Sequence, residues 1–196
     1  MDQSLIQFRS STPESTEALA ELLGGLLFDG VVLALEGEMG AGKTTFARGL
    51  ARGLGVDEPV TSPTYTLMQE YEGRLHFWHL DAWMAEREEA FLEAGAADLL
   101  GSSGVALVEW SENVRDWLPI PRLLLRMTPC PLGKQGLGLG RTLEFSVIGD
   151  SDAAESELHS LLRDLWRSSG ALEGVELLPG SDPEEPGPGG GEPISS

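Results

Sequence analysis

The stretch Gly37-Glu38-Met39-Gly40-Ala41-Gly42-Lys43-Thr44 determines the fold that this sequence predicts. It matches the phosphate-loop (Walker A) pattern of two glycines five residues apart, followed by lysine and threonine. The glycines let backbone N–H groups turn inward, the lysine reaches the β and γ phosphates, and the threonine hydroxyl can bind Mg²⁺. We therefore predict that nucleotide phosphates bind along this loop, at Glu38, Met39, Gly40, Ala41, Gly42, Lys43, Thr44 and Thr45.

The segments on either side of the loop have the periodicity that such a site requires. Residues 31–35 form a continuous apolar run, typical of a strand buried in a parallel sheet. After the loop, apolar residues recur at helical spacing from Phe46 to Leu54, and Gly55 is suited to end that helix. A strand, a loop and a helix in this order form half of a βαβ unit, which predicts an α/β fold.

The rest of the chain predicts further strands and two more helices. Apolar runs predict strands at residues 5–8, 75–80, 105–108, 123–127 and 143–147. The first of these is expected at the edge of the sheet, and the last two flank a glycine-rich connection, residues 133–140. Thr12 as N-cap and Pro13 after it predict the start of a helix. Asp152 and Glu155 form a capping-box pattern at the start of the last helix.

The length of 196 residues fits a single domain with a C-terminal extension. From Pro179 onward, 18 residues contain five Pro, five Gly and four acidic residues but no basic one. Such a segment cannot bury enough apolar surface to offset the entropy of ordering it. We predict a domain over residues 1–168 and a disordered, acidic tail over residues 169–196.

The charge of the chain excludes several functions. Thirteen basic and 32 acidic residues give a formal net charge of −19. Because binding to a nucleic-acid backbone depends on Lys and Arg that neutralise phosphates, we expect no DNA binding and no autonomous RNA binding. No apolar run reaches the length of a membrane helix and no signal peptide is visible, so we expect a cytoplasmic protein without membrane contact. The single cysteine, Cys130, stands between two prolines and is not expected to react.

Two acidic residues directly follow predicted strands: Asp81 and Glu109. Acids at the carboxyl ends of parallel strands point toward the crevice where α/β sheets bind ligands, and phosphoryl chemistry needs acids for the metal and the water. A strand-end acid standing alone is more often a turn or capping residue. His79 is interpreted as a core histidine or as one that orients Asp81, and Trp110 as core packing or as a cover over the nucleotide.

A hydroxyl-rich segment, Thr61-Ser62-Pro63-Thr64-Tyr65-Thr66-Leu67, lies between the loop helix and the first of these acids. Segments of this type can become ordered around a γ-phosphate and its Mg²⁺, as switch loops do. The alternative is a turn that leads into a strand.

With the phosphate loop, this hydroxyl-rich segment, His79-Leu80-Asp81 and Val108-Glu109-Trp110 in that order and spacing, the sequence strongly resembles the TsaE (YjeE) family. The resemblance covers roughly residues 5–150, and Gly140-Arg141 before a strand also matches. It implies a P-loop NTPase-like fold, with a mixed or mostly parallel central sheet flanked by helices.

The resemblance also implies roles for particular residues. Lys43 would contact phosphates, Thr44 and Glu109 would hold Mg²⁺, and Asp81 would be an essential acid near the metal. Catalysis would thus depend on Glu109, Asp81 and Lys43. Thr64 would act as a switch residue, and His79, Trp110 and Arg141 would lie near the site. Adenine would be contacted near residues 11–16 and near Arg141.

The function implied by the resemblance is the synthesis of threonylcarbamoyladenosine in transfer RNA. The family consists of weak ATPases that act with TsaB and TsaD, whose complex modifies adenosine 37 of transfer RNAs that read codons beginning with A. Hydrolysis of ATP with Mg²⁺ would reset that complex, and the RNA would be met only through the partners. Where the family usually continues the His79-Leu80-Asp81 motif with Leu-Tyr-Arg, this chain has Ala82-Trp83-Met84. The arginine is missing, and Arg87 is a candidate substitute.

Three alternatives remain open at this point. A GTPase of the common type would contain Asn-Lys-x-Asp, but the only asparagine, Asn113, is followed by Val114. A small P-loop kinase would need an acceptor pocket and a basic lid, and the sequence has no such basic cluster. A nucleotide-gated adaptor without catalysis is harder to separate, because it would use the same loop.

Overall fold

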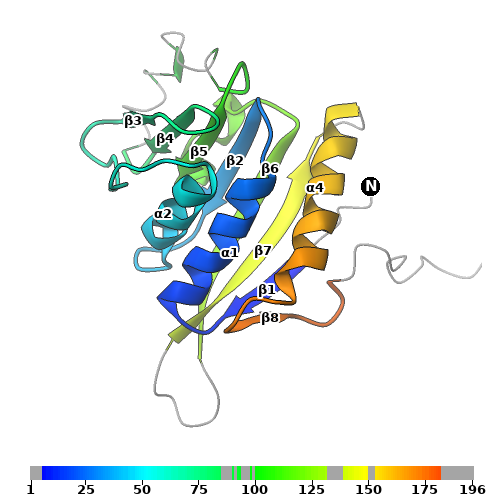
Figure 1. The fold of residues 1–196 in the computed structure, drawn as a ribbon. Helices are drawn as coiled ribbons and strands as arrows, with labels where there is room; N and C mark the ends of the chain where they lie inside the picture. Colours follow the sequence, from blue (N-terminus) through cyan, green and yellow to red (C-terminus); the bar gives the residue numbers. More distant parts are fainter. Residues whose placement is uncertain are drawn as a thin grey trace, which may run out of the picture.

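A computed structural model describes residues 6–84, 90, 92–93, 98, 100–131, 139–149 and 153–181 of the chain. One twisted sheet forms the centre, and helices α1 (Pro13–Leu26), α2 (Lys43–Gly53) and α4 (Ala153–Ser169) cover one face of it (Figure 1). Within these described residues, no helix is both long and apolar enough to cross a membrane.

The sheet has a parallel centre and antiparallel edges. Its strands follow the order β3-β4-β5-β2-β6-β7-β1-β8. Their bounds are Ile6–Ser10 (β1), Val31–Glu36 (β2), Met68–Tyr71 (β3), Phe77–Asp81 (β4), Val105–Glu109 (β5), Arg122–Pro131 (β6), Leu139–Ile148 (β7) and Val175–Leu177 (β8). Strands β4, β5, β2 and β6 run parallel to one another, whereas β3, β7 and β8 pair antiparallel with their neighbours. The predicted P-loop NTPase-like fold, with a mixed but mostly parallel centre, is confirmed.

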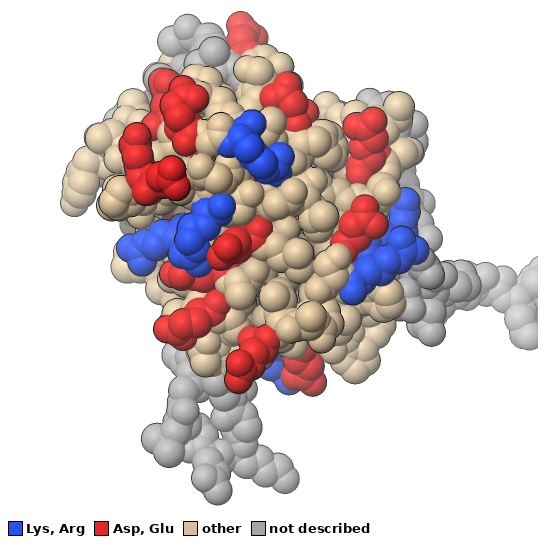
Figure 2. All heavy atoms as spheres, viewed as in Figure 1, with Lys and Arg blue, Asp and Glu red and all other residues tan. Residues whose placement is uncertain are grey.

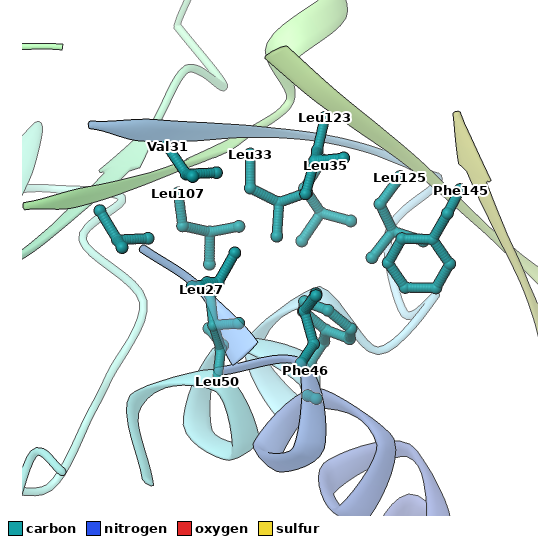
Figure 3. Packing of buried hydrophobic residues seen from close by; sticks show 14 of the residues in the cluster. Leu27, Val31, Leu33, Leu35, Phe46, Leu50, Leu107, Leu123, Leu125 and Phe145 are labelled. Atoms are coloured by element: carbon teal, nitrogen blue, oxygen red, sulfur yellow. The ribbon is translucent and has the colours of Figure 1, made fainter. Parts of the chain in front are cut away.

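Strand β2 is apolar throughout because both of its faces are covered. Val31, Leu33 and Leu35 point toward the helices, where they meet Phe46 and Leu50 of α2 (Figure 3). Val32 and Ala34, on the opposite face, belong to a smaller cluster with Val108 of β5 and with Val114 and Leu118. The last two residues flank η3 (Arg115–Trp117), which follows η2 (Ser111–Asn113). A strand with two buried faces reads as a continuous apolar run, which explains why the sequence identified it.

Helices α1 and α2 pack at backbone contact because glycines line their interface. A Cβ atom on Gly49 or Gly53 would collide with the carbonyl oxygen of Glu17 or Glu21, and one on Gly24 would collide with the carbonyl oxygen of Leu50. These clashes show that no side chain larger than hydrogen fits between the helices at these points. The close approach fixes the position of α1 against the helix that follows the phosphate loop.

The first helix begins where the sequence predicted. The Thr12 side chain accepts a hydrogen bond from Ser15 N (3.1 Å), and the Ser15 hydroxyl accepts one from Thr12 N (3.0 Å), which completes a capping box. Pro13 occupies the first turn, where its missing N–H costs nothing. The capping pattern predicted for the last helix involves Asp152, which lies outside the described residues.

Two expectations about the edges of the sheet were wrong. Strand β1 is not an edge strand, because β8 pairs with its outer side. The tail predicted from residue 169 begins too early, since Val175 and Leu177 pack against the core and Ser181 bonds to Gln7 of β1. The Pro- and Gly-rich composition starts only at Pro179, and the apolar residues before it form the additional strand β8. Residues 182–196 lie outside the described residues.

The helix interface yields a stability prediction. Gly53→Ala should lower the free energy of unfolding by about 1–3 kcal/mol, the usual range for overpacking, because α2 must move away from Glu21. Gly25→Ala is the matched control, since a Cβ atom on Gly25 meets nothing within 4 Å. The control should be neutral or raise the free energy of unfolding by up to about 1 kcal/mol. Urea denaturation compares them, and equal effects of both substitutions would contradict the packing argument.

Candidate functional site

The phosphate loop connects the end of β2 with the start of α2 and needs glycine at defined positions. Gly40 and Gly42 have φ angles of 79° and 103°, which disfavour any side chain. A Cβ atom on Gly37 would lie 2.6 Å from the carbonyl oxygen of Met127 on β6. No side chain caps α2 at Gly42. The loop is therefore held close to β6, with the N-terminus of α2 directed at the space that it encloses.

Lys43 is the cation inside the loop. Its Nζ atom donates hydrogen bonds to the carbonyl oxygens of Gly37 (2.6 Å) and Glu38 (3.1 Å) and lies 3.5 Å from the centroid of the Trp110 ring. Burial lowers the pKa of Lys43 below its ordinary value, while the carboxylates of Glu109, Glu112 and Asp81 act in the opposite direction. The ammonium group is thus oriented by the loop itself and by the indole ring.

Arg141 supports the same loop from β7. Its Nε atom donates to the carbonyl oxygen of Ala41 (2.6 Å), and its Nη2 atom donates to that of Gly40 (3.2 Å). The arginine follows these two loop residues by 100 and 101 positions in the sequence. The predicted proximity of Arg141 to the site is therefore seen in the structure as a direct contact with the loop backbone.

The two strand-end acids lie side by side. Strands β4 and β5 are parallel neighbours, and their register pairs Asp81 with Glu109. Both side chains are almost completely buried. Two carboxylates at adjacent strand ends, next to a buried ammonium group, form a compact and highly charged centre in an environment with little water.

His79 contacts Glu109 rather than Asp81. Its Nε2 atom lies 2.9 Å from Oε1 of Glu109, and the imidazole stacks on the ring of Phe77. The histidine is fully buried, and its Nδ1 atom has no hydrogen-bond partner among the described residues. The interpretation of His79 as a core residue is confirmed. The interpretation of His79 as the residue that orients Asp81 is wrong. His79, Asp81 and Glu109 all lie on the helix side of the sheet, because strand residues two apart share a face, so only the contact across β4 and β5 decides which acid the imidazole meets.

Asp81 anchors the hydroxyl-rich segment. Its Oδ2 atom accepts hydrogen bonds from the hydroxyl groups of Thr64 (2.5 Å) and Ser62 (3.0 Å), and its Oδ1 atom accepts one from the backbone N–H of Trp83 (3.0 Å). Residues 61–67 form a loop that turns at residues 64–66. A ligand that recruits the Thr64 hydroxyl has to compete with Asp81.

These groups surround one open cavity of about 490 Å³. Its walls are formed by Met39, Gly40, Gly42, Lys43, Thr44, Thr45, Arg48, Ser62, Thr64, Asp81, Trp83, Glu109, Trp110 and Arg141. Of the predicted site residues, Glu38, Ala41 and His79 are not among these walls, although each contacts a residue that is.

Three residues of the cavity were not predicted: Arg48, Ser62 and Trp83. Arg48 follows Thr44 by one helical turn, so helical spacing from the loop could have identified it. Ser62 belongs to the hydroxyl-rich segment already noted. Trp83 follows Asp81 by two residues and contacts Trp110, with 4.5 Å between ring centroids, a meeting of two strand ends that no local pattern reveals.

Strand order and loop together place this chain in the class of proteins with the P-loop NTPase fold. The model of the family described as "Threonylcarbamoyl adenosine biosynthesis protein TsaE" matches residues 10–132, and the chain belongs to this family. A solved structure, that of YdiB from Bacillus subtilis, is similar with a TM-score of 0.68 and 30% identity, covering 85% of this chain and 97% of that one.

Similar proteins with known sequences support the same family assignment. A Bacillus subtilis protein named "tRNA threonylcarbamoyladenosine biosynthesis protein TsaE" is 42% identical over 146 residues, which cover 74% of this chain and 87% of that protein. A Treponema pallidum protein with the same name is 41% identical over 110 residues, covering 56% and 82% of the two chains. The similarity therefore extends over most of each relative.

The contact between His79 and Glu109 leads to a prediction about stability. His79→Leu should lower the free energy of unfolding by about 1–3 kcal/mol or more, because a buried carboxylate loses its partner. The double variant His79→Leu/Glu109→Leu should lose clearly less than the sum of the two single variants, since removing both polar partners is less costly than removing one. Urea denaturation of all four proteins gives the coupling energy, and strict additivity would show that the contact contributes nothing.

Proposed function

We propose that this protein binds ATP with Mg²⁺ in the cavity at the phosphate loop and hydrolyses it during the synthesis of threonylcarbamoyladenosine at position 37 of transfer RNA. The observation that carries the proposal is the meeting of Lys43, Asp81 and Glu109 in one cavity, at the N-terminus of α2. Membership in the TsaE family supports the role in transfer-RNA modification.

The loop fits a chain of phosphates. Its backbone from Glu38 to Thr45 wraps the N-terminus of α2, where N–H groups and the helix dipole favour an anion. In a protein with a net charge of −19, a polyanion needs such a local site. Lys43, which now donates to two loop carbonyl oxygens, has the charge and reach to donate to phosphate oxygens instead.

The residues also fit a magnesium ion that is shared with the nucleotide. Thr44, Asp81 and Glu109 line the same cavity and offer one hydroxyl and two carboxylates. No group of three or more His, Cys, Asp or Glu side chains able to hold a metal occurs among the described residues. Two carboxylates suit Mg²⁺, because this ion usually binds proteins through one or two carboxylates and takes its other ligands from phosphates and water. When bound, the ion supplies positive charge to the phosphates.

In the proposed reaction the chain orients groups and stabilises charge. Thr44 and Glu109 hold the metal, while His79 keeps the Glu109 carboxylate in one orientation through Oε1. Asp81 orients the water whose oxygen bonds to the γ-phosphorus as the bond to the bridging oxygen of ADP breaks, which releases ADP, phosphate and a proton. Asp81 also controls Thr64, whose hydroxyl it now binds. Lys43 places a positive charge where the phosphates gain negative charge.

A small cavity next to the loop supports a position for the adenine. It has a volume of about 40 Å³ and lies between the start of α1 and Arg141. Thr12, Pro13, Thr16, Gly42, Thr45 and Arg141 line it. This position agrees with the adenine contacts that the resemblance implies. Because the cavity is smaller than the base, we propose that it widens when adenine binds.

The surface around the mouth of the cavity supports protein partners, which we propose to be TsaD and TsaB. Met39, Tyr65, Trp83 and Met84 expose 77%, 88%, 45% and 46% of their surface, respectively. Met39 and Trp83 line the cavity, and Tyr65 and Met84 directly follow the lining residues Thr64 and Trp83 in sequence. Exposed apolar side chains gathered at one site commonly mark a protein interface. On the helix-covered face, acidic and basic side chains are interspersed, with no extended basic area (Figure 2). Because the chain as a whole has a net charge of −19, we propose that transfer RNA is contacted only through the partners, in the cytoplasm.

An adaptor that binds ATP without hydrolysing it is the main alternative, and a small P-loop kinase is the second. The arginine that the family usually has after the His79-Leu80-Asp81 motif is replaced by Met84, which is half exposed. Its candidate substitute, Arg87, lies outside the described residues. The buried pair of Asp81 and Glu109 favours hydrolysis over simple binding, because binding alone does not require two buried acids.

ATP binding is tested by Lys43→Ala. The variant should bind ATP at least about 100-fold more weakly, because it loses charge-assisted hydrogen bonds worth roughly 1.5–3 kcal/mol together with the loop geometry that they hold. Arg52→Gln is the matched control, a cation on the same helix that pairs with Glu17 and Glu21 instead. Calorimetric titration with ATP and Mg²⁺ measures the affinity, and circular dichroism checks the fold. Wild-type affinity of Lys43→Ala would refute the site.

Hydrolysis is tested by Glu109→Gln, alone and with TsaB and TsaD. We expect slow turnover by the wild-type protein, stimulation by the partners, and a loss of about 100-fold or more in the variant with ATP binding retained. Phosphate release measures turnover, and transfer-RNA modification over several rounds measures recycling. Full recycling by Glu109→Gln would support the adaptor, and the absence of any effect of TsaB and TsaD would contradict the proposed partners.

A further inference from the structure

Three arginines converge on a small cavity away from the nucleotide cavity. Arg115, Arg122 and Arg126 are three of only 13 basic residues in the chain. They line a space of about 120 Å³ together with Ala34, Glu36, Ser111, Leu118, Leu124 and Ile148. The apolar lining residues belong to the cluster on the sheet face opposite α1, α2 and α4. The two cavities have no lining residue in common.

The charges in this cavity are not balanced by the residues that line it. Glu36 is the only acid among them, and it accepts from Nη2 of Arg115 (2.9 Å) and from Nε of Arg126 (2.8 Å). Arg122 forms no ion pair with any described carboxylate. Its Nη1 atom donates instead to the carbonyl oxygens of Leu118 (3.0 Å) and Pro119 (3.2 Å). The lining residues thus provide one carboxylate for three guanidinium groups, and only two of these groups pair with it.

Arg122 makes this imbalance costly because it is 7% exposed. Burial lowers the pKa of its guanidinium group below the ordinary value and the charge of Arg115 adds to that effect, while the carboxylates of Glu36 and Asp116 act in the opposite direction. A buried cation is normally paired with a carboxylate or another anion, since transfer of an unpaired charge from water is unfavourable. Although Asp116 acts on Arg122 and Glu112 on Arg115 from outside the lining, no carboxylate pairs directly with Arg122 among the described residues.

Ser111 provides a second, independent observation. Its side chain is 2% exposed and lines the cavity, and its hydroxyl oxygen has no hydrogen-bond partner among the described residues. Buried hydroxyl groups are almost always hydrogen-bonded, so an unpartnered one next to three guanidinium groups indicates a missing acceptor.

We propose that this cavity binds the phosphoryl group of a small ligand, as a free phosphate or as a phosphate monoester. Guanidinium groups donate pairs of parallel hydrogen bonds to phosphate oxygens, and the Ser111 hydroxyl donates to a remaining oxygen. The volume equals roughly that of four water molecules in the liquid, which admits a phosphoryl group but not a nucleotide.

A larger cavity next to this site offers space for the rest of an ester. It has a volume of about 440 Å³ and shares Glu36 and Arg126 with the arginine site. Trp110, Met127 and Pro129 contribute apolar surface to it. An ester with a flat apolar substituent can thus place its phosphoryl group on the arginines and its substituent against these side chains.

The position of the arginine site couples it to the phosphate loop. Glu36 directly precedes Gly37, the first residue of the loop, and Ser111 follows Glu109 by two residues. A bound phosphoryl group competes with Glu36 for Arg115 and Arg126. The ligand thereby acts on the residue from which the loop begins, which goes beyond the proposed function and does not depend on hydrolysis.

The test is a phosphate titration of Lys43→Ala, in which the phosphate loop no longer competes for the anion. We expect binding with a dissociation constant of about 1 mM, measured by calorimetry and by the side-chain NMR signals of Arg122. Arg115→Gln/Arg126→Gln in the same background should weaken binding at least 10-fold. These two arginines are about half exposed, so the variant is expected to fold, which its melting curve verifies.

Arg9→Gln/Arg52→Gln in the same background is the matched control, since it removes two other exposed arginines that pair with acids. It should bind phosphate like Lys43→Ala alone. Tighter binding of phenyl phosphate than of inorganic phosphate identifies an ester as the ligand, and equal or weaker binding identifies free phosphate. Absence of phosphate binding by Lys43→Ala, or equal weakening by the two double variants, would overturn the proposal.

Discussion

The parallel pairing of β2 with β5 on one side and β6 on the other is the constraint on which both cavities depend. Its register places Leu35 beside Glu109 and Glu36 beside Arg126, while the pairing of β4 with β5 brings Asp81 next to Glu109. Strands β4, β5 and β2 end at the same edge of the sheet, so the phosphate loop and the acids meet there, whereas Arg122 stands at the start of β6 and only Arg126 lies beside the end of β2. A shift of one residue in this register would turn each of these side chains to the opposite face.

Positive charges lie in two separate, partly buried places near this edge of the sheet. The chain is strongly acidic overall, yet Lys43 is enclosed by loop carbonyl groups and by Trp110, and the arginines gather on the opposite side of the sheet. Because charges in a partly buried environment interact more strongly than at the surface, a few well-placed cations outweigh a distant excess of acids. The same argument applies to both phosphoryl sites that we propose in this acidic protein.

The parts that could be predicted are those for which a local pattern reflects a physical requirement. The glycines of the loop are needed for φ angles of 79° and 103°, and the apolar run of β2 reflects burial on both faces. Asp81 and Glu109 could be identified because they directly follow such strands. The partner of His79, the added strand β8 and the contact of Arg141 with the loop could not, since each joins residues that are far apart in sequence.

The sequence by itself thus determined the class of fold, the phosphate loop and the identity of the two acids, because loop geometry and strand burial act over a few consecutive residues. Only the tertiary structure decided that His79 contacts Glu109, that Asp81 holds the Thr64 hydroxyl, and that three arginines line one cavity in which Glu36 pairs with two of them. These contacts depend on strand order and register. These contacts are strong because the tertiary structure buries charged groups from different strands next to one another. No single stretch of the chain contains both partners of such a contact.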